Sequence, residues 1–335
     1  MEEYYQTFEE RPVITKRIFS GKYSFIINVV LFLLTFFTTT VAGVAWIAGP
    51  VAAFNLNYFH IGLPYSISIL FIIGVHEFGH YFAARYHKVK STLPFFIPFP
   101  ITDYFLNFGT LGAVIKTKSS VPTKKAMFDI GVAGPIAGFF ASIIVLIYGF
   151  THLPSVNYIL QIHPNYFSPQ KTPDALELEF GQNILYRVLQ TIFTNPNTEF
   201  VPPMTEIYHY PYLCTGWFGL FVTAMNLIPV GQLDGGHIAY SLFGSSVHRR
   251  IADVSFSLLM LLGIGGFVSE VLNLSVPIGW SGWIFWGLIL RFFVKLYHPE
   301  IDNPFELDPL RKKIGYFAIF ILVVSFIPAP FYIKI

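Results

Sequence analysis

Residues 65–84 read YSISILFIIGVHEFGHYFAA, an apolar run that contains two histidines and a glutamate. In a helix, His76 and His80 lie one turn apart on one face, which is the spacing that two imidazoles need to bind one metal ion. Glu77 lies beside them and can act as a general base. Ionisable groups at membrane depth are costly, so we interpret these residues as functional rather than as two helix-packing histidines with an incidental glutamate.

The composition predicts a membrane protein. Of the 335 residues, 54% are hydrophobic and only 12% are charged, and the mean hydropathy is +0.57. A soluble domain has about 25% charged residues. No basic run with interleaved aromatic residues is present, so we expect a lipid bilayer and no nucleic acid as a partner. The first ten residues, MEEYYQTFEE, are acidic, which is wrong for a signal or transit peptide, so the first apolar segment is expected to be a retained helix.

The expected fold is an all-α polytopic membrane protein with about seven transmembrane helices. A spanning helix needs about 20 mainly apolar residues. Segments that meet this requirement are roughly 23–48, 62–86, 126–150, 212–243, 249–272, 276–297 and 314–332. The fourth is expected to be interrupted at Pro229–Gly231 and again at Gly235–Gly236. Broken helices at membrane depth are tolerated where they line a protein-buried or wet cavity.

The basic residues predict the orientation. With these seven spans, 18 of the 21 Lys and Arg residues lie on one face, which should be cytoplasmic. The N-terminus is then cytoplasmic, the C-terminus is outside, and the two histidines lie in the cytoplasmic half of the bilayer. We expect the membrane to be a bacterial inner (cytoplasmic) membrane.

Two connections look more complex than simple loops. Residues 87–125 are rich in aromatic and β-branched residues with Gly breaks, which predicts a short membrane-associated β-hairpin region. Residues 151–211 are polar and should lie outside. The expected organisation is an N-terminal segment with the first helix (1–61), a catalytic core (62–243) and C-terminal transmembrane helices (244–335).

A zinc ion in a catalytic site has three protein ligands and one position for water. The best candidate for the third ligand is Asp234, in the stretch NLIPVGQLDGGH at 226–237. The predicted topology places it at the depth of His76 and His80. Because Pro229 and Gly231 break the helix, Asp234 could cap the helix that restarts there, and the dipole of that helix would favour an ionised carboxylate. The alternative is a plain helix-capping aspartate.

Two further features of the apolar helices are notable. The amide of Asn226 could donate to a substrate carbonyl or a developing oxyanion, and an interhelical hydrogen bond is an equally good interpretation. Gly134 and Gly138 are four residues apart in the third span, a spacing that permits close helix approach. We expect them to pack against the helix that carries the histidines.

The motif HEFGH in an apolar helix, the AGP-containing third span and NLIPVGQLDGG together resemble the site-2 protease family of intramembrane zinc metalloproteases. The resemblance covers roughly residues 62–150 and 212–243 and implies a three-helix catalytic core. It implies His76, His80 and Asp234 as ligands of Zn²⁺, Glu77 as the catalytic glutamate, and Asn226 near the scissile bond.

The resemblance also implies a substrate-binding strand. The segment around Phe108–Lys118 looks like the hairpin that engages an unwound substrate by strand addition in such proteases, which implicates Gly109, Gly112 and Val114. Many members carry PDZ or CBS domains, and neither is visible here. The hydrophobic hairpin and the missing PDZ domain are similar to the plastid and cyanobacterial-type branch.

These features predict an intramembrane zinc endopeptidase that cleaves transmembrane segments of other membrane proteins, as in regulated intramembrane proteolysis. Three alternatives stay open. The chain could be a non-catalytic chaperone or adaptor of the same fold, although an intact Glu77 argues against this. It could be an ion-coupled transporter with the same polar residues as its path, although no inverted repeat is visible. It could also be a different membrane zinc protease with a glutamate as third ligand, but Glu270 lies at the wrong depth.

Overall fold

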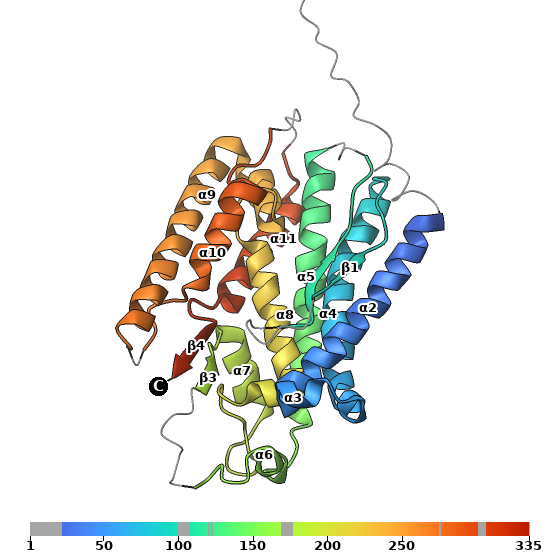
Figure 1. Ribbon diagram of the computed structural model, residues 1–335. Coiled ribbons are helices and arrows are strands. Elements are labelled where there is room, and N and C mark those ends of the chain that lie inside the picture. Colours follow the sequence, from blue (N-terminus) through green and yellow to red (C-terminus); the bar gives the residue numbers. More distant parts are fainter. Residues whose placement is uncertain are drawn as a thin grey trace, which may run out of the picture.

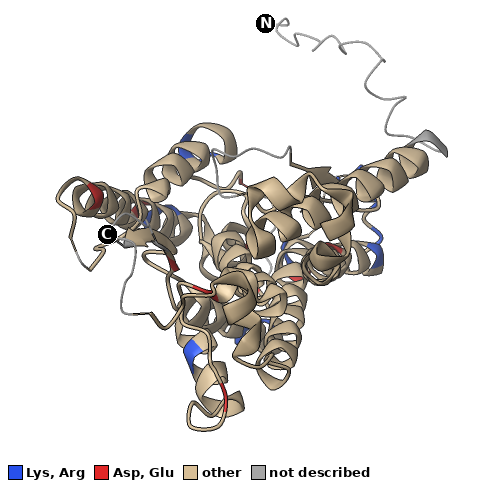
Figure 2. Ribbon diagram, turned by 60° about the horizontal axis from the view of Figure 1, so that its bottom comes forward, with Lys and Arg blue, Asp and Glu red and all other residues tan. Residues whose placement is uncertain are grey.

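The structure is a computed structural model that describes residues 22–99, 107–119, 121, 123–168, 177–274, 276–300 and 306–334. The basic residues at positions 11–17, which contribute to the predicted orientation, lie outside this range. Most of the described chain is helical, and Figure 1 shows the long helices side by side in one bundle. Figure 2 shows few charged residues along these helices, as the composition predicts for segments that contact lipid.

Four helices among the described residues are long and apolar enough to cross a membrane. They are α2 (Lys22–Ala48), α4 (Phe59–Tyr86), α5 (Lys124–Thr151) and α9 (Asp234–Val271). Three shorter helical segments occupy the other predicted spans, namely α8 (Pro211–Leu227), α10 (Gly282–Ile289) with the π-helical turn η3 (Leu290–Val294), and α11 (Pro309–Ser325). The predicted all-α membrane architecture therefore holds in outline, and the count of seven spans remains a prediction.

The predicted break at Pro229–Gly231 is confirmed, but the second predicted break is wrong. Gly235 and Gly236 lie inside the first turn of α9. A Cβ atom added to them would lie 2.0 Å from the Leu227 carbonyl oxygen and 2.2 Å from that of Gly231, respectively. These glycines therefore allow the new helix to begin tightly against the chain that precedes it, without interrupting the helix.

The boundary between the fourth and fifth predicted segments also differs. Helix α9 continues to Val271 and bends only at Gly244, whose φ of 80° is a conformation that glycine adopts readily. The last predicted span begins five residues early, because Asp308 caps α11 through the amide of Arg311 and Pro309 occupies its first turn. That helix ends at Ser325, shortly before Pro328 and Pro330.

The two complex connections contain ordered structure. In the first, β1 (Phe95–Pro98) and β2 (Thr110–Val114) pair antiparallel, with an irregularity between Phe96 and Pro98. The second was predicted to be polar and to lie outside the membrane, with no helices or strands assigned to it. It folds into α6 (Asn157–Ile162), β3 (Glu177–Phe180), α7 (Ile184–Phe193) and the 3₁₀ turn η2 (Ile207–His209).

The C-terminal strand pairs with a strand of this second connection. Strand β4 (Phe331–Lys334) pairs antiparallel with β3, from Glu177 opposite Lys334 to Phe180 opposite Phe331. Figure 1 shows this sheet beside α7, with α6 at the same end of the bundle. Two short segments complete that end: α3 (Pro50–Ala53) and η1 (Leu56–Tyr58), which connect α2 to α4.

Candidate metal centre

Three side chains from two helices meet inside the bundle. The Nε2 atoms of His76 and His80 on α4 are 3.1 Å apart. The Asp234 Oδ2 atom at the start of α9 lies 3.6 Å from the Nε2 atom of His76 and 3.3 Å from that of His80. With zinc–ligand bonds of about 2.0–2.1 Å, the ligand atoms of a tetrahedral site are roughly 3.3–3.4 Å apart. The three atoms therefore have the spacing of zinc ligands.

The environment of this triangle suits a bound cation. His76 and His80 are each only 7% exposed, and the carboxylate of Asp234 supplies a negative charge between them. Nδ1 of His80 is 2.7 Å from the Ile130 carbonyl oxygen on α5. Because a carbonyl only accepts, Nδ1 must donate the proton, which leaves the Nε2 lone pair directed at the triangle.

Close packing of α4 on α5 holds the two histidines. A Cβ atom at Gly134 would lie 2.1 Å from Nε2 of His80, and one at Gly138 would lie 3.0 Å from Nδ1 of His76. From the other side, a Cβ atom at Gly79 would lie 2.7 Å from the Ala133 carbonyl oxygen. The prediction that Gly134 and Gly138 pack against the helix carrying the histidines is confirmed.

The break between α8 and α9 determines where Asp234 lies. Gly231 has a φ of +56°, and its amide donates to the Leu296 carbonyl oxygen at 2.9 Å. A Cβ atom there would lie 1.9 Å from the Lys295 carbonyl oxygen, so only glycine fits this approach. The expected capping role of Asp234 is wrong. Leu233 is the N-cap residue, the α9 N-terminus has no side-chain cap, and the Asp234 carboxylate faces the histidines instead.

Two other predicted residues lie next to the triangle. Glu77 is 8% exposed, and its carboxyl group lies near the backbone of Ile115, the residue after β2. Nδ2 of Asn226, in the last turn of α8, is 3.4 Å from Nε2 of His76. The structure thus brings all five predicted core residues together around one point.

The predicted substrate-binding residues divide into two groups. Gly109 is buried against α2, where its carbonyl accepts a hydrogen bond from the Thr38 hydroxyl at 2.6 Å. Gly112 has a φ of +97° and open space at its Cβ position, and Val114 is 50% exposed. Strand β2 pairs with β1 on one edge, and no described strand pairs with its other edge.

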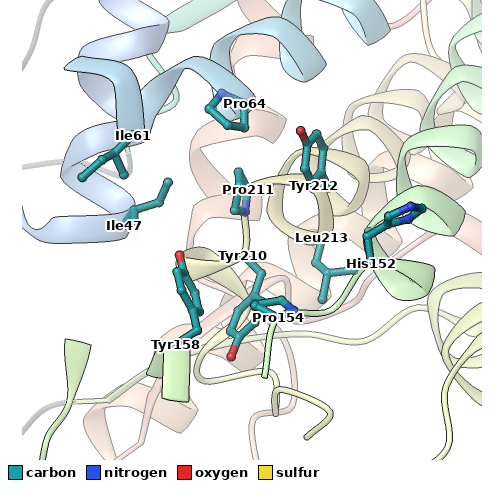
Figure 3. Close-up of a pocket in the computed structure, with 11 residues that line it drawn as sticks. Ile47, Ile61, Pro64, His152, Pro154, Tyr158, Tyr210, Pro211, Tyr212 and Leu213 are labelled. Carbon is teal, nitrogen blue, oxygen red and sulfur yellow. The ribbon is translucent and has the colours of Figure 1, made fainter. Parts of the chain in front are cut away.

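No sequence pattern indicated a cavity or a second polar cluster at the other end of the bundle. The cavity, of about 320 Å³, is lined by residues from the ends of α2, α4, α5 and α8 that lie far from the triangle (Figure 3). The cluster contains His163, Glu206 and His209; Glu206 and His209 are three residues apart, but His163 lies far from both in the sequence. Because 42 residues separate His163 from Glu206, only the fold reveals this cluster.

Comparison with known proteins places these observations in a family. The profile of "Peptidase family M50" matches residues 64–265, which include the whole triangle. The probable zinc metalloprotease EGY1, chloroplastic, of Oryza sativa subsp. japonica is 29% identical over 91% of this chain. The probable zinc metalloprotease EGY2 and the probable zinc metallopeptidase EGY3, both chloroplastic, of Arabidopsis thaliana are 26% and 31% identical over 83% and 76% of it.

The chain spans about half the length of these relatives, namely 51% of the rice protein and 44% and 41% of the two Arabidopsis proteins. No solved structure matches the chain.

Proposed function

Because this chain belongs to peptidase family M50, the family of the site-2 proteases, we propose that it is a zinc-dependent endopeptidase that cleaves other proteins within or near the bilayer. The observation that carries this proposal is the triangle of His76, His80 and Asp234 with buried Glu77 beside it, built from helices that are long and apolar enough to span a membrane. A catalytic zinc site has three protein ligands, which this set supplies.

The roles of the residues follow from their chemistry. His76, His80 and Asp234 would hold the ion. Bound zinc would polarise the substrate carbonyl and make hydroxide available near neutral pH. Glu77 accepts the proton from the attacking water and delivers it to the leaving amine, since it is the nearby carboxylate outside the ligand triangle. Asn226 directs its amide into the same space and can donate to the oxygen of the scissile carbonyl.

The proposed substrate is a transmembrane segment of another protein that unwinds before cleavage. Peptide bonds within a helix are protected, so an extended conformation must be stabilised near the ion. The second edge of β2 offers backbone groups for an added strand. The backbone of Ile115, directly after β2, reaches Glu77, so a strand added along Gly112 and Val114 would pass close to the base.

The membrane arrangement proposed with this function keeps the predicted orientation. The N-terminus and the half of the bilayer that contains the triangle would face the cytoplasm of a bacterial inner membrane, and residues 62–243 would form the catalytic core. The names of the relatives above include the word chloroplastic. An experiment on localisation should therefore compare a bacterial inner membrane with a plastid membrane.

The proposal is tested with Glu77→Gln in the purified full chain, reconstituted in nanodiscs with a single-span substrate. We expect cleavage to fall on the order of 10²–10⁴-fold, the usual contribution of a general base, while bound zinc is retained. The matched control is Glu270→Gln, because Glu270 lies in α9 but bonds to Ser281 away from the triangle. Asp234→Ala should lose the zinc ion of this triangle as well as activity.

Full cleavage by Glu77→Gln would overturn the mechanism. If the wild-type chain binds membrane proteins without cleaving them, the chaperone or adaptor alternative would replace it. Ion flux in proteoliposomes that requires the same residues would instead support the transporter.

A further inference from the structure

A second triangle of two histidines and a carboxylate lies away from the candidate metal centre. Nε2 of His163 is 3.0 Å from Nε2 of His209. The Glu206 Oε2 atom is 3.6 Å from each of these nitrogens. Apart from the His76–His80–Asp234 triangle, it is the one group in the described part of the chain with three such ligand atoms mutually within 4.8 Å.

The two triangles have nearly the same size. The sides of the first are 3.1, 3.3 and 3.6 Å, and those of the second are 3.0, 3.6 and 3.6 Å. Both lie within a few tenths of an ångström of the spacing of roughly 3.3–3.4 Å that tetrahedral zinc requires. Two histidines with one glutamate are also a donor set found in protein zinc sites.

The second triangle lies one helix length away from the first. Helix α8 begins two residues after His209 and ends at Leu227, seven residues before Asp234. Its 17 residues correspond to roughly 25 Å of helix, so the two sites cannot share an ion. Residues 157–163 with α6, and 206–209 with η2, belong to the connection that was predicted to lie outside the membrane.

Hydrogen bonds orient His209 for metal binding. Its Nδ1 atom is 2.9 Å from the Ile47 carbonyl oxygen near the end of α2. The carbonyl must accept, so Nδ1 carries the proton and the lone pair of Nε2 points into the triangle. The hydroxyl of Tyr158 donates to the His209 carbonyl oxygen at 2.6 Å, which ties α6 to the same residue. His80 is held in the same way by Ile130.

The three side chains of the second triangle differ in their exposure to solvent. The side chain of His209 is 7% exposed and that of Glu206 is 13% exposed, whereas that of His163 is 43% exposed. A cation there would be held by buried His209 and largely covered Glu206 and reached from solvent past His163. The carboxylate supplies the negative charge that stabilises a divalent cation between two neutral imidazoles.

We propose that His163, Glu206 and His209 bind a second zinc ion at the α6 end of the bundle. The ion would fasten α6 to η2 and, through Ile47, to the end of α2. Ile47 and Tyr158 also line the cavity in Figure 3, so the site braces one wall of that cavity. The competing explanation is a metal-free hydrogen bond from Nε2 of His163 to Nε2 of His209.

Zinc stoichiometry of the full chain in detergent distinguishes the two explanations. Wild type, His80→Gln, His163→Gln and the double variant would be loaded with Zn²⁺, dialysed against metal-free buffer, and measured by inductively coupled plasma mass spectrometry. We expect two zinc ions per chain in wild type, one in each single variant and none in the double variant. His152→Gln, an exposed histidine that stacks on Tyr148 at the same end, should retain both ions.

A second measurement guards against misfolding of the variants. Loading His80→Gln with Co²⁺ alone should produce the visible absorption of a tetrahedral ion, and Glu206→Gln in that background should abolish it with unchanged helicity by circular dichroism. One zinc ion in wild type that disappears in His80→Gln would overturn the proposal. So would a stoichiometry that is the same in wild type and His163→Gln. Neither result depends on whether the chain cleaves a substrate.

Discussion

Small residues at the α4–α5 contact decide whether the two histidines can reach Asp234. Gly79, Gly134 and Gly138 remove the side chains that would otherwise separate the two helices. The imidazole of His80 occupies the space that a side chain at position 134 would need. A larger residue than glycine there would displace this proposed ligand. In membranes, glycine at helix contacts permits such close approach.

Gly134→Ala should therefore impair the site without changing any proposed ligand. The added methyl group would lie 2.1 Å from Nε2 of His80 and must displace the ring. Since a misplacement of about 1 Å can cost on the order of 100-fold in rate, we expect a loss of that order in kcat/KM together with weaker zinc binding. Gly74→Ala on α4 is the control, because its nearest neighbour would be the Phe96 ring at 3.8 Å. Equal activity of the two variants would contradict this account.

At the scale of elements, β2 links the candidate metal centre to α2 and to exposed apolar side chains. Trp46 and Thr38 of α2 hold the start of the strand through the carbonyl oxygens of Asn107 and Gly109. The positive φ of Gly112 interrupts the alternation of buried and exposed residues, so Leu111 and Val114 are both exposed. An apolar pair next to a strand edge that has no partner strand among the described residues is what an extended transmembrane segment would contact.

Replacing Leu111 and Val114 with serine should weaken substrate binding and leave the metal centre intact. Both side chains are at least half exposed, at 66% and 50%, so little packing is lost within the protein. Burial of such side chains against a substrate contributes about 1–3 kcal/mol, which corresponds to a rise in KM of roughly 5- to 150-fold. Steady-state kinetics and zinc content would be measured together. A fall in kcat alone, with KM unchanged, would argue against strand addition.

A polar junction joins the ends of three helices near the start of α5. Arg311 of α11 binds both carboxylate oxygens of Asp129 on α5, at 2.7 and 2.6 Å. His87, directly after α4, lies 2.7 Å from the same carboxylate. Because Arg311 lies 182 positions away from Asp129 in the chain, local sequence patterns do not indicate this pair.

A double-mutant cycle on Asp129→Asn and Arg311→Ala should show a coupling of about 1–2 kcal/mol in the free energy of unfolding. The side chains are only 20–21% exposed and the pair is bidentate, which favours a measurable interaction. The matched control is the exposed pair Lys312–Glu306, at 2.9 Å, for which we expect no measurable coupling. Equilibrium unfolding in detergent would provide both values, and equal coupling in the two pairs would refute the expectation.

At the scale of the whole molecule, the C-terminus is tied to the connection between α5 and α8. Strand β4 pairs with β3, and the Phe331 ring packs against Phe180 and Trp217 with centroid distances of 5.3 and 5.2 Å. The end of α2 reaches the same end of the bundle through Ile47 and His209. If α2 crosses the membrane, its end lies on the same side as β4 and its start lies on the opposite side. The chain from the start of α2 to β4 then crosses the membrane an odd number of times, a condition that the seven proposed spans meet.

The single cysteine makes this orientation testable. Cys214 is buried and free, so a Cys214→Ala background carries no other thiol. Cysteines introduced at Lys118 and at Asn197, both exposed, should react with a membrane-impermeant maleimide only from opposite sides of sealed vesicles. Both should react after detergent is added. Labelling of both positions from the same side would exclude the proposed topology.

The membrane class, the His76–His80 pair and the break before Asp234 follow from the amino-acid sequence alone. These features depend on composition, a one-turn helical spacing and the backbone preferences of proline and glycine, all of which are local. The sequence also indicated Asp234 as the partner, through the shared depth of two predicted spans. The metal-binding and catalytic roles of these residues remain predictions.

Which distant groups meet depends on the tertiary structure. The β3–β4 sheet, the Asp129–Arg311 pair and the contact of His163 with Glu206 and His209 join residues that are 43 to 182 positions apart, and no periodicity or spacing links these partners. Their contacts form because the order in which the helices pack brings particular helix ends together, and packing order is a property of the whole chain.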